Sequence, residues 1–170
     1  NYFTNSSLLN YKEYVYSNDN GPHFKPVIEK MIDSKGNELL TFNKYPVDYN
    51  IHWNYIQDDF SRALFMMKDS NRQIPIETKT ILKSNKEELL SASLINYKPF
   101  NGLVLKAEIN RLNKTNENFI DSYIKFENPY ITFVKSENYQ KDITYLSYYE
   151  NGNVKEVVNN LGLHTVYIWG

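Results

Sequence analysis

The densest group of side chains able to do chemistry lies in residues 48–59, which read Asp-Tyr-Asn-Ile-His-Trp-Asn-Tyr-Ile-Gln-Asp-Asp. On a strand, successive side chains point to opposite faces, so Trp53 and Tyr55 share one face and His52 and Asn54 the other. An aromatic ring can stack on a sugar while amide, imidazole and carboxylate groups bind its hydroxyls. This segment therefore predicts a ligand-binding patch of six side chains: His52, Trp53, Asn54, Tyr55, Asp58 and Asp59.

The acidic residues of this segment allow two other interpretations. Paired carboxylates can serve as general acid and base in glycoside hydrolysis, so a glycan-acting hydrolase would rest on Asp48, His52, Asp58 and Asp59. Alternatively, Trp53 belongs to the core and Asp58-Asp59 is a solvated turn. Adjacent acids on a turn point apart, which favours the structural interpretation over catalysis.

Other catalytic and metal-binding patterns are missing from the sequence. There is no cysteine, which excludes disulfides, thiolate metal sites and a cysteine nucleophile. The histidines, His23, His52 and His164, are far apart and form no His-Glu-x-x-His motif. The sequence also lacks a Gly-x-Ser-x-Gly elbow and a glycine-rich phosphate loop. We therefore expect a protein without metal or cofactor, and a binding protein rather than an enzyme.

Charge and hydropathy limit the partners and the setting. The net charge is −1, and the basic residues are scattered, with arginine only at Arg62, Arg72 and Arg111, so nucleic-acid binding is not expected. No apolar run reaches the length of a membrane span. The chain begins with Asn1 rather than Met and has a polar start, which favours an exported protein, secreted, periplasmic or lipid-anchored upstream of Asn1.

Residue composition and alternation both favour β-strands. The chain has 15 Tyr, 9 Phe and 2 Trp, and alanine is scarce, which suits strands better than a helical bundle. Gly36 predicts a hairpin turn within residues 25–42, and Asn151-Gly152 predicts another between residues 143–149 and 154–158. Further strands are expected at residues 103–109, 120–126, 130–135 and 164–169.

Two segments are harder to assign. Alternation over residues 60–68 and 73–82, with Asp69-Ser70-Asn71-Arg72 between them, predicts a further hairpin. Ser84 and Glu87 match a capping box, which would start a short helix over residues 85–94. The apolar residues of that segment also alternate as in a strand, so both assignments stay open.

The sequence as a whole predicts a mainly β protein. We expect a single-domain antiparallel sandwich or barrel-like fold of about nine or ten strands, with at most one or two short helices. Residues 1–20 would form a partly flexible tether, and residues 21–170 the β-rich domain.

One short motif resembles a known family. The stretch from Tyr148 to Glu156 contains Glu150-Asn151-Gly152-Asn153 and is followed by Gly162-Leu163-His164. It resembles one unit of the MORN-variant repeat of bacterial antitoxin-like proteins. The resemblance covers a single segment of the chain, and it implies an immunity or antitoxin role.

Two functions are therefore expected from the sequence. The first is a non-catalytic extracytoplasmic binding module for a carbohydrate or a protein, because abundant tyrosine and amide side chains favour recognition surfaces. The alternative is an immunity or antitoxin-type protein that binds and neutralises a toxin. Neither identifies the ligand, and the oligomeric state stays open.

Overall fold

The computed structural model describes residues 11–16, 24–52, 56–113, 119–127 and 129–169. In this part of the chain most residues lie in antiparallel strands, and there is one α-helix. The prediction of a mainly β, antiparallel fold is confirmed. No helix in the described ranges is long and apolar enough to cross a membrane.

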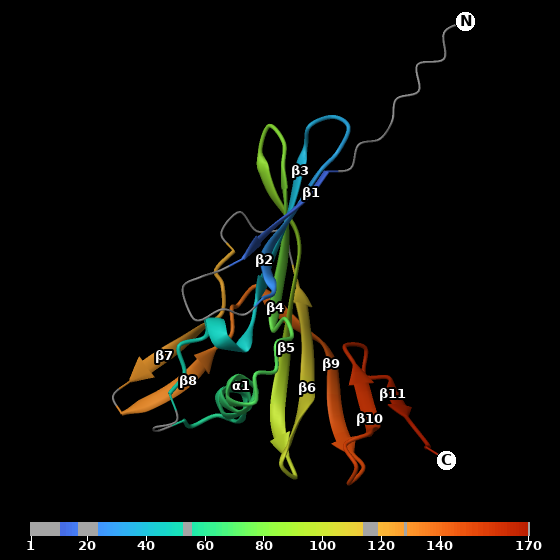
Figure 1. The fold of residues 1–170 in the computed structure, drawn as a ribbon. Coiled ribbons are helices and arrows are strands. Elements are labelled where there is room, and N and C mark those ends of the chain that lie inside the picture. The colour runs from blue at the N-terminus through green and yellow to red at the C-terminus, as the bar shows by residue number, and fades with distance from the viewer. Residues whose placement is uncertain (1–10, 17–23, 53–55, 114–118, 128, 170) are drawn as a thin grey trace, which may run out of the picture.

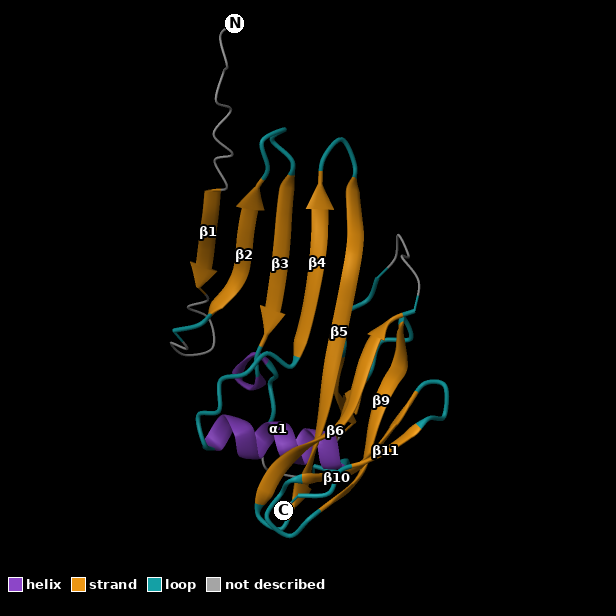
Figure 2. Ribbon diagram, turned by 90° about the vertical axis from the view of Figure 1, so that its right-hand side faces the viewer, coloured by secondary structure: helices purple, strands orange, loops and turns teal. Residues whose placement is uncertain are grey.

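A nine-stranded antiparallel sheet forms the body of the protein (Figures 1 and 2). Each strand pairs with its neighbours in sequence, except that β6 pairs with β9. Short hairpin connections explain most of this order, because consecutive strands joined by tight turns pair with each other; β3 and β4 pair although a long insertion joins them. In sheet order the strands are β1 (Tyr11–Tyr16), β2 (Pro26–Ile32), β3 (Glu38–Lys44), β4 (Glu77–Lys83), β5 (Glu87–Phe100), β6 (Leu103–Leu112), β9 (Tyr139–Tyr148), β10 (Val154–Asn159) and β11 (His164–Val166).

Two insertions interrupt the meander and build a second layer. The first, between β3 and β4, carries the short 3₁₀ helix η1 (Pro46–Asp48) and the α-helix α1 (Asp59–Asp69). The second, between β6 and β9, folds into the hairpin β7 (Tyr123–Glu127) and β8 (Tyr130–Val134). A bridge between Ile56 and Ile131 joins the two insertions. Figure 1 shows α1 between this hairpin and the lower half of the large sheet.

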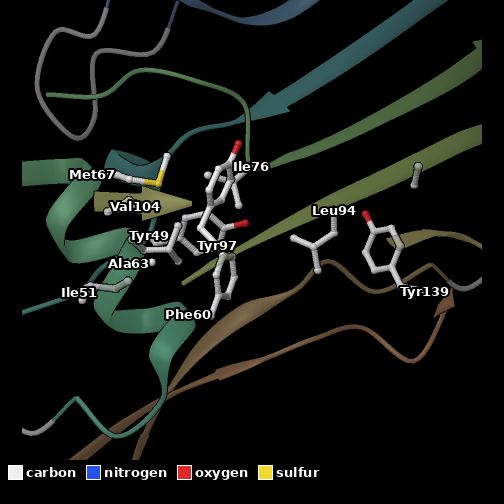
Figure 3. Close-up of a cluster of buried hydrophobic side chains, with 12 residues drawn as sticks. Tyr49, Ile51, Phe60, Ala63, Met67, Ile76, Leu94, Tyr97, Val104 and Tyr139 are labelled. Atoms are coloured by element: carbon white, nitrogen blue, oxygen red, sulfur yellow. The ribbon is translucent and has the colours of Figure 1, made fainter. Parts of the chain in front are cut away.

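The core lies between α1, the second insertion and the sheet (Figure 3). α1 contributes one face, with Phe60, Ala63, Leu64 and Met67 all buried. This is the i, i+3, i+4, i+7 spacing of an amphipathic helix. The sheet and the η1 segment contribute the other large buried side chains: Tyr49, Ile51, Ile76, Leu94, Tyr97, Val104 and Tyr139.

The strand predicted over residues 60–68 is wrong, because this segment is the helix α1. Its apolar residues satisfy both a two-residue and a helical period, and two features select the helix. Asp58 caps the first turn by accepting a hydrogen bond from the Ser61 amide at 2.7 Å. The helical face also meets β5, so its burial outweighs the local alternation.

The helix considered for residues 85–94 is also not formed, because the strand alternative is the observed one. The Ser84 amide donates to the Lys86 carbonyl in a tight turn, and β5 starts at Glu87. Pairing with β4 and β6 on its two sides stabilises β5 beyond what a one-turn cap could offer.

The two glycine hairpins predicted from sequence are confirmed, and a third turn has the same geometry. In each, the first amide donates to the fifth carbonyl, and a glycine amide at the fourth position donates back to the first carbonyl. The three glycines have φ of +82°, +84° and +78°, a region open to glycine at little cost. The turns are residues 33–37, 149–153 and 159–163.

β1 extends the sheet into the segment expected to be a tether. Its residues pair with β2 from Tyr11 to Tyr16, with a register shift at Val15–Tyr16. The rest of the expected tether, residues 1–10 and 17–20, lies outside the described residues.

Candidate functional site

The structure places the described residues of the predicted ligand patch in different surroundings. Asp58 is a structural carboxylate, because it accepts hydrogen bonds from the Ser61 hydroxyl at 2.6 Å and the Phe133 amide at 3.0 Å in addition to its cap. Asp59 is exposed and lies 3.6 Å from Arg62 in the first turn of α1. His52 is exposed as well. The remaining three, Trp53, Asn54 and Tyr55, lie outside the described residues, so the patch stays a prediction.

Asp48 also has a structural position. One of its carboxylate oxygens accepts a hydrogen bond from the Tyr45 amide at 2.7 Å, which closes the η1 turn. Asp48 and Asp58, two of the carboxylates in the hydrolase interpretation, therefore both cap backbone turns. A carboxylate held by amide donors in this way stabilises a helix start.

A buried carboxylate, Glu77, is the polar centre that sequence reasoning missed. Only 4% of the residue is exposed. One oxygen accepts hydrogen bonds from the Ser122 hydroxyl at 3.0 Å and the Ser122 amide at 3.3 Å, and the other accepts from the Tyr49 hydroxyl at 3.4 Å. Buried charges are stable only when hydrogen-bonded, so this contact holds the second insertion against the sheet.

The network around Glu77 extends to both insertions. The Ser122 hydroxyl accepts a hydrogen bond from the Ser136 amide at 3.2 Å, on the far side of the β7–β8 hairpin. The Lys44 ammonium donates to the Ser122 carbonyl at 2.9 Å and lies 4.4 Å from the centre of the Tyr49 ring. Both ends of the hairpin are thereby attached to β3 and β4 through Ser122.

Burial changes the acidity of the tyrosines beside this carboxylate. Burial, and then the charge of Glu77, raise the pKa of Tyr49 well above its ordinary value. Burial and the charge of Glu77 likewise raise the pKa of Tyr139, whose hydroxyl has no hydrogen-bond partner of good geometry in the described structure. Both phenols stay neutral, so neither is poised to act as a base.

A cleft of about 310 Å³ opens beside this network. Lys79 crosses it, 2.8 Å from the Asp121 carboxylate and 5.3 Å from the centre of the Phe42 ring. The other lining residues are Val27, Ile28, Asn43, Lys44, Asp48 and Glu77. Its charged groups already contact one another or the backbone, so a ligand would have to replace existing bonds. These charged groups connect the large sheet to the second insertion.

The outer side of the β7–β8 hairpin is a different kind of surface. Cross-strand pairing places Ile124 opposite Phe133, and the Phe133 ring packs edge-on against Phe60, with 4.4 Å between the ring centres. The alternate residues therefore point away from the core. They are Tyr123, Lys125, Glu127, Tyr130, Thr132 and Val134, and we refer to them as the hairpin face.

The hairpin face carries two half-exposed tyrosines. Tyr123 is 48% exposed and Tyr130 is 47% exposed, at opposite ends of the hairpin. Between them Lys125 and Glu127 form an ion pair of 2.5 Å. Because the inner side is fixed to α1 and to Ser122, these tyrosines are presented on a rigid support.

Other tyrosines divide between core and surface. Four are buried, Tyr45, Tyr49, Tyr97 and Tyr139, while Tyr14, Tyr16 and Tyr167 join the hairpin pair among the exposed ones. A binding surface rich in tyrosine leaves many of its tyrosines partly exposed. Among the described tyrosines, these five are exposed, and Tyr145, Tyr148 and Tyr149 are half-buried.

No metal centre emerges from the described residues, since none of their His, Asp and Glu side chains gather in groups of three or more. Comparison with protein-family models, curated proteins and solved structures finds no match for the chain.

Proposed function

We propose that this chain is a non-catalytic protein-binding module, and that the hairpin face is its recognition surface. The observation that supports this most directly is the pair of half-exposed tyrosines on a hairpin whose opposite side is locked into the core. A tyrosine ring offers a large contact with a polar tip at low entropic cost. A rigid support lowers that cost further, since less is ordered on binding.

Protein is favoured over carbohydrate as the ligand because of what surrounds the tyrosines. Ile120, which precedes the face along the chain, is 66% exposed. Large apolar side chains at the surface mark protein interfaces, which combine aromatic anchors with a polar rim. The Lys125–Glu127 pair would supply that polar rim.

The test compares the wild-type chain with a Tyr123→Ser/Tyr130→Ser variant as immobilised bait. Both tyrosines point outward, so the variant should keep the fold, which circular dichroism and thermal melting would check. A protein captured by the wild type is then purified and titrated against both baits. Saturable binding that the variant weakens at least ~100-fold supports the proposal, since two aromatic anchors that contribute ~1.4 kcal/mol or more each give a factor of ten apiece.

A Tyr14→Ser/Tyr16→Ser variant is the matched control. It also removes two exposed tyrosines, but from β1 rather than the hairpin. Equal loss of binding in both variants would contradict the assignment of the hairpin face. Saturable binding of a purified glycan that depends on Tyr123 and Tyr130 would replace the protein ligand by a carbohydrate.

An immunity or antitoxin role is the second candidate, in which the bound protein is a toxin. It is supported by the turn at residues 149–153, within the MORN-like stretch, whose backbone hydrogen bonds recur at residues 33–37 and 159–163. Expression together with a toxin encoded next to its gene should restore growth. Failure of rescue by a well-expressed chain would remove this candidate.

An extracytoplasmic location is part of the same proposal. Cell fractionation with an antibody against the chain would test it. Recovery only in the cytoplasmic fraction would refute it.

A further inference from the structure

The edge of the sheet at β11 is an unprotected strand surrounded by exposed apolar side chains. β11 is the last strand in the sheet order, and no described strand pairs with its outer side (Figure 1). Six large apolar residues within and beside it are 41–90% exposed: Leu161, Leu163, Val166, Tyr167, Ile168 and Trp169. Exposed apolar clusters of this kind mark interaction sites.

The composition of this edge differs from that of a protected one. Residues 157–169 contain no Lys, Arg, Asp, Glu or Pro, the residues that usually block edge-to-edge pairing. The opposite edge, β1, does carry such charges: Lys12 and Glu13, with Lys12 paired to Glu29 at 3.1 Å. Of the two edges that the described residues give the large sheet, the β11 edge is therefore the one free of charges that would oppose a neighbouring strand.

The hydrogen bonds to β10 determine which backbone groups of the edge are free. The Asn159 amide donates to the Leu163 carbonyl, and the Tyr167 amide donates to the Lys155 carbonyl. In an antiparallel ladder alternate residues bond to the same neighbour, so residues 163, 165 and 167 face β10. The amides and carbonyls of residues 164, 166 and 168 consequently face outward.

The segment after β11 is held in place as an extension of the edge. The indole of Trp169 donates a hydrogen bond to the Val154 carbonyl at 2.7 Å, and the Tyr149 hydroxyl donates to the Tyr167 carbonyl at 3.0 Å. The Tyr167 and Trp169 rings stack with 6.3 Å between their centres. The outward groups of residues 164–168 are thus presented as one template.

We propose that a second copy of this chain pairs with this template, antiparallel and about a two-fold axis at Val166. This register places Val166 opposite itself, His164 opposite Ile168, Thr165 opposite Tyr167 and Leu163 opposite Trp169 of the second copy. A register shifted toward the N-terminus would require the turn at Leu161–Gly162, where Gly162 has φ of +78° and cannot extend a strand.

The pairing is self-complementary, as a two-fold interface must be. Every pair joins apolar, aromatic or β-branched side chains, and no like charges face each other across the axis. The pairing would cover part of the exposed apolar surface of residues 163–169, and an edge that lacks charges and pairs with its own sequence suits a second copy of the same chain.

Sedimentation velocity across a concentration series tests the proposal, together with a Val166→Pro variant. The Val166 amide faces outward, so proline removes no hydrogen bond to β10, and circular dichroism should be unchanged. Both copies lose a donor, so the dimer Kd should rise at least ~30-fold. A Tyr14→Lys variant changes the opposite edge and should leave the Kd unaltered.

Disulfide trapping gives a second measurement that does not depend on proline. The chain has no cysteine, so a Val166→Cys variant carries a single thiol. Two hydrogen-bonded residues on the axis lie ~5.5 Å apart between Cα atoms, within disulfide range. Mild oxidation should give a covalent dimer, whereas a Tyr14→Cys variant should stay monomeric.

Three results would overturn the proposal. They are a monomer at every concentration, a dimer that Val166→Pro leaves unchanged, and equally efficient cross-linking by Tyr14→Cys. None of them bears on the hairpin face, which Figure 1 shows on the other side of α1 from β11.

Discussion

Replacing Glu77 is the sharpest test of how the second insertion is attached to the sheet. The carboxylate is buried and accepts three hydrogen bonds, two from Ser122 and one from Tyr49. Glu77→Ala would leave the Ser122 amide and hydroxyl and the Tyr49 hydroxyl without this acceptor inside the protein. An unsatisfied buried polar group costs about 1–3 kcal/mol, and Glu77→Ala would leave all three of these donors without their acceptor.

The expected magnitude follows from these contacts. Three orphaned donors, offset by water entering the space left by the side chain, give a loss of about 3–5 kcal/mol for Glu77→Ala. For a chain of this size that lowers the melting temperature by about 10 °C or more. Glu77→Gln keeps one carbonyl acceptor for Ser122 and should lose about 1–2 kcal/mol.

Urea unfolding followed by tyrosine and tryptophan fluorescence measures these free energies. Glu88→Gln, at an exposed position in β5, makes the same chemical change without a buried partner and should lie within about 0.5 kcal/mol of wild type. Hydrogen exchange should show faster opening of residues 122–136 in Glu77→Ala. Equal stability of Glu77→Gln and Glu88→Gln would refute the reasoning.

The α1 cap, the glycine turns and the buried tyrosines each give a further test. Asp58→Ala removes the cap and the acceptor of the Phe133 amide, and urea titration should show a loss of about 1–3 kcal/mol; an unchanged midpoint would count against it. Gly36→Ala and Gly152→Ala should both lower the melting temperature, because the two glycines have φ of +82° and +84° and the Leu103 side chain near 152 is exposed and can rotate away from a Cβ. An unchanged melting temperature in either variant would contradict this. The contribution of the core tyrosines to stability should be constant below pH 10 and fall above it, since burial raises their pKa above 10.0 and they lose protons only on unfolding. Melting curves at alkaline pH would check the sign, and rising stability would disprove it.

The sequence by itself determined most of the sheet. Alternation and turn residues are local properties, so the hairpin at Gly36 and the one at Gly152 could be read directly from neighbouring residues. The strands near residues 103, 123 and 130 follow from the same two-residue period. Short connections then imply antiparallel neighbours, which accounts for the pairs β2–β3, β4–β5, β5–β6, β9–β10 and β10–β11, whereas the β3–β4 pair is joined through the insertion with α1.

The helix α1 shows where local pattern was insufficient. Its apolar residues satisfy the period of a strand as well as that of a helix. The sequence nevertheless contained two signals for the helix: Asp58 as a cap and the helical spacing from Phe60 to Met67. Ser84 and Glu87 match a helix-capping pattern but form no helix. The segment that follows them is the strand β5, which pairs with β4 on one side and β6 on the other. In both cases long-range burial selects between two local conformations of similar free energy.

The surfaces that carry function were decided only by the tertiary structure. Glu77 stands 45 residues from Ser122, and nothing in its sequence neighbourhood distinguishes it from any strand glutamate. The exposure of Tyr123 and Tyr130, and of the β11 edge, depends on which sides the core covers. Strand periodicity is set by backbone geometry between neighbours, whereas burial and polar contacts depend on segments that meet only after folding.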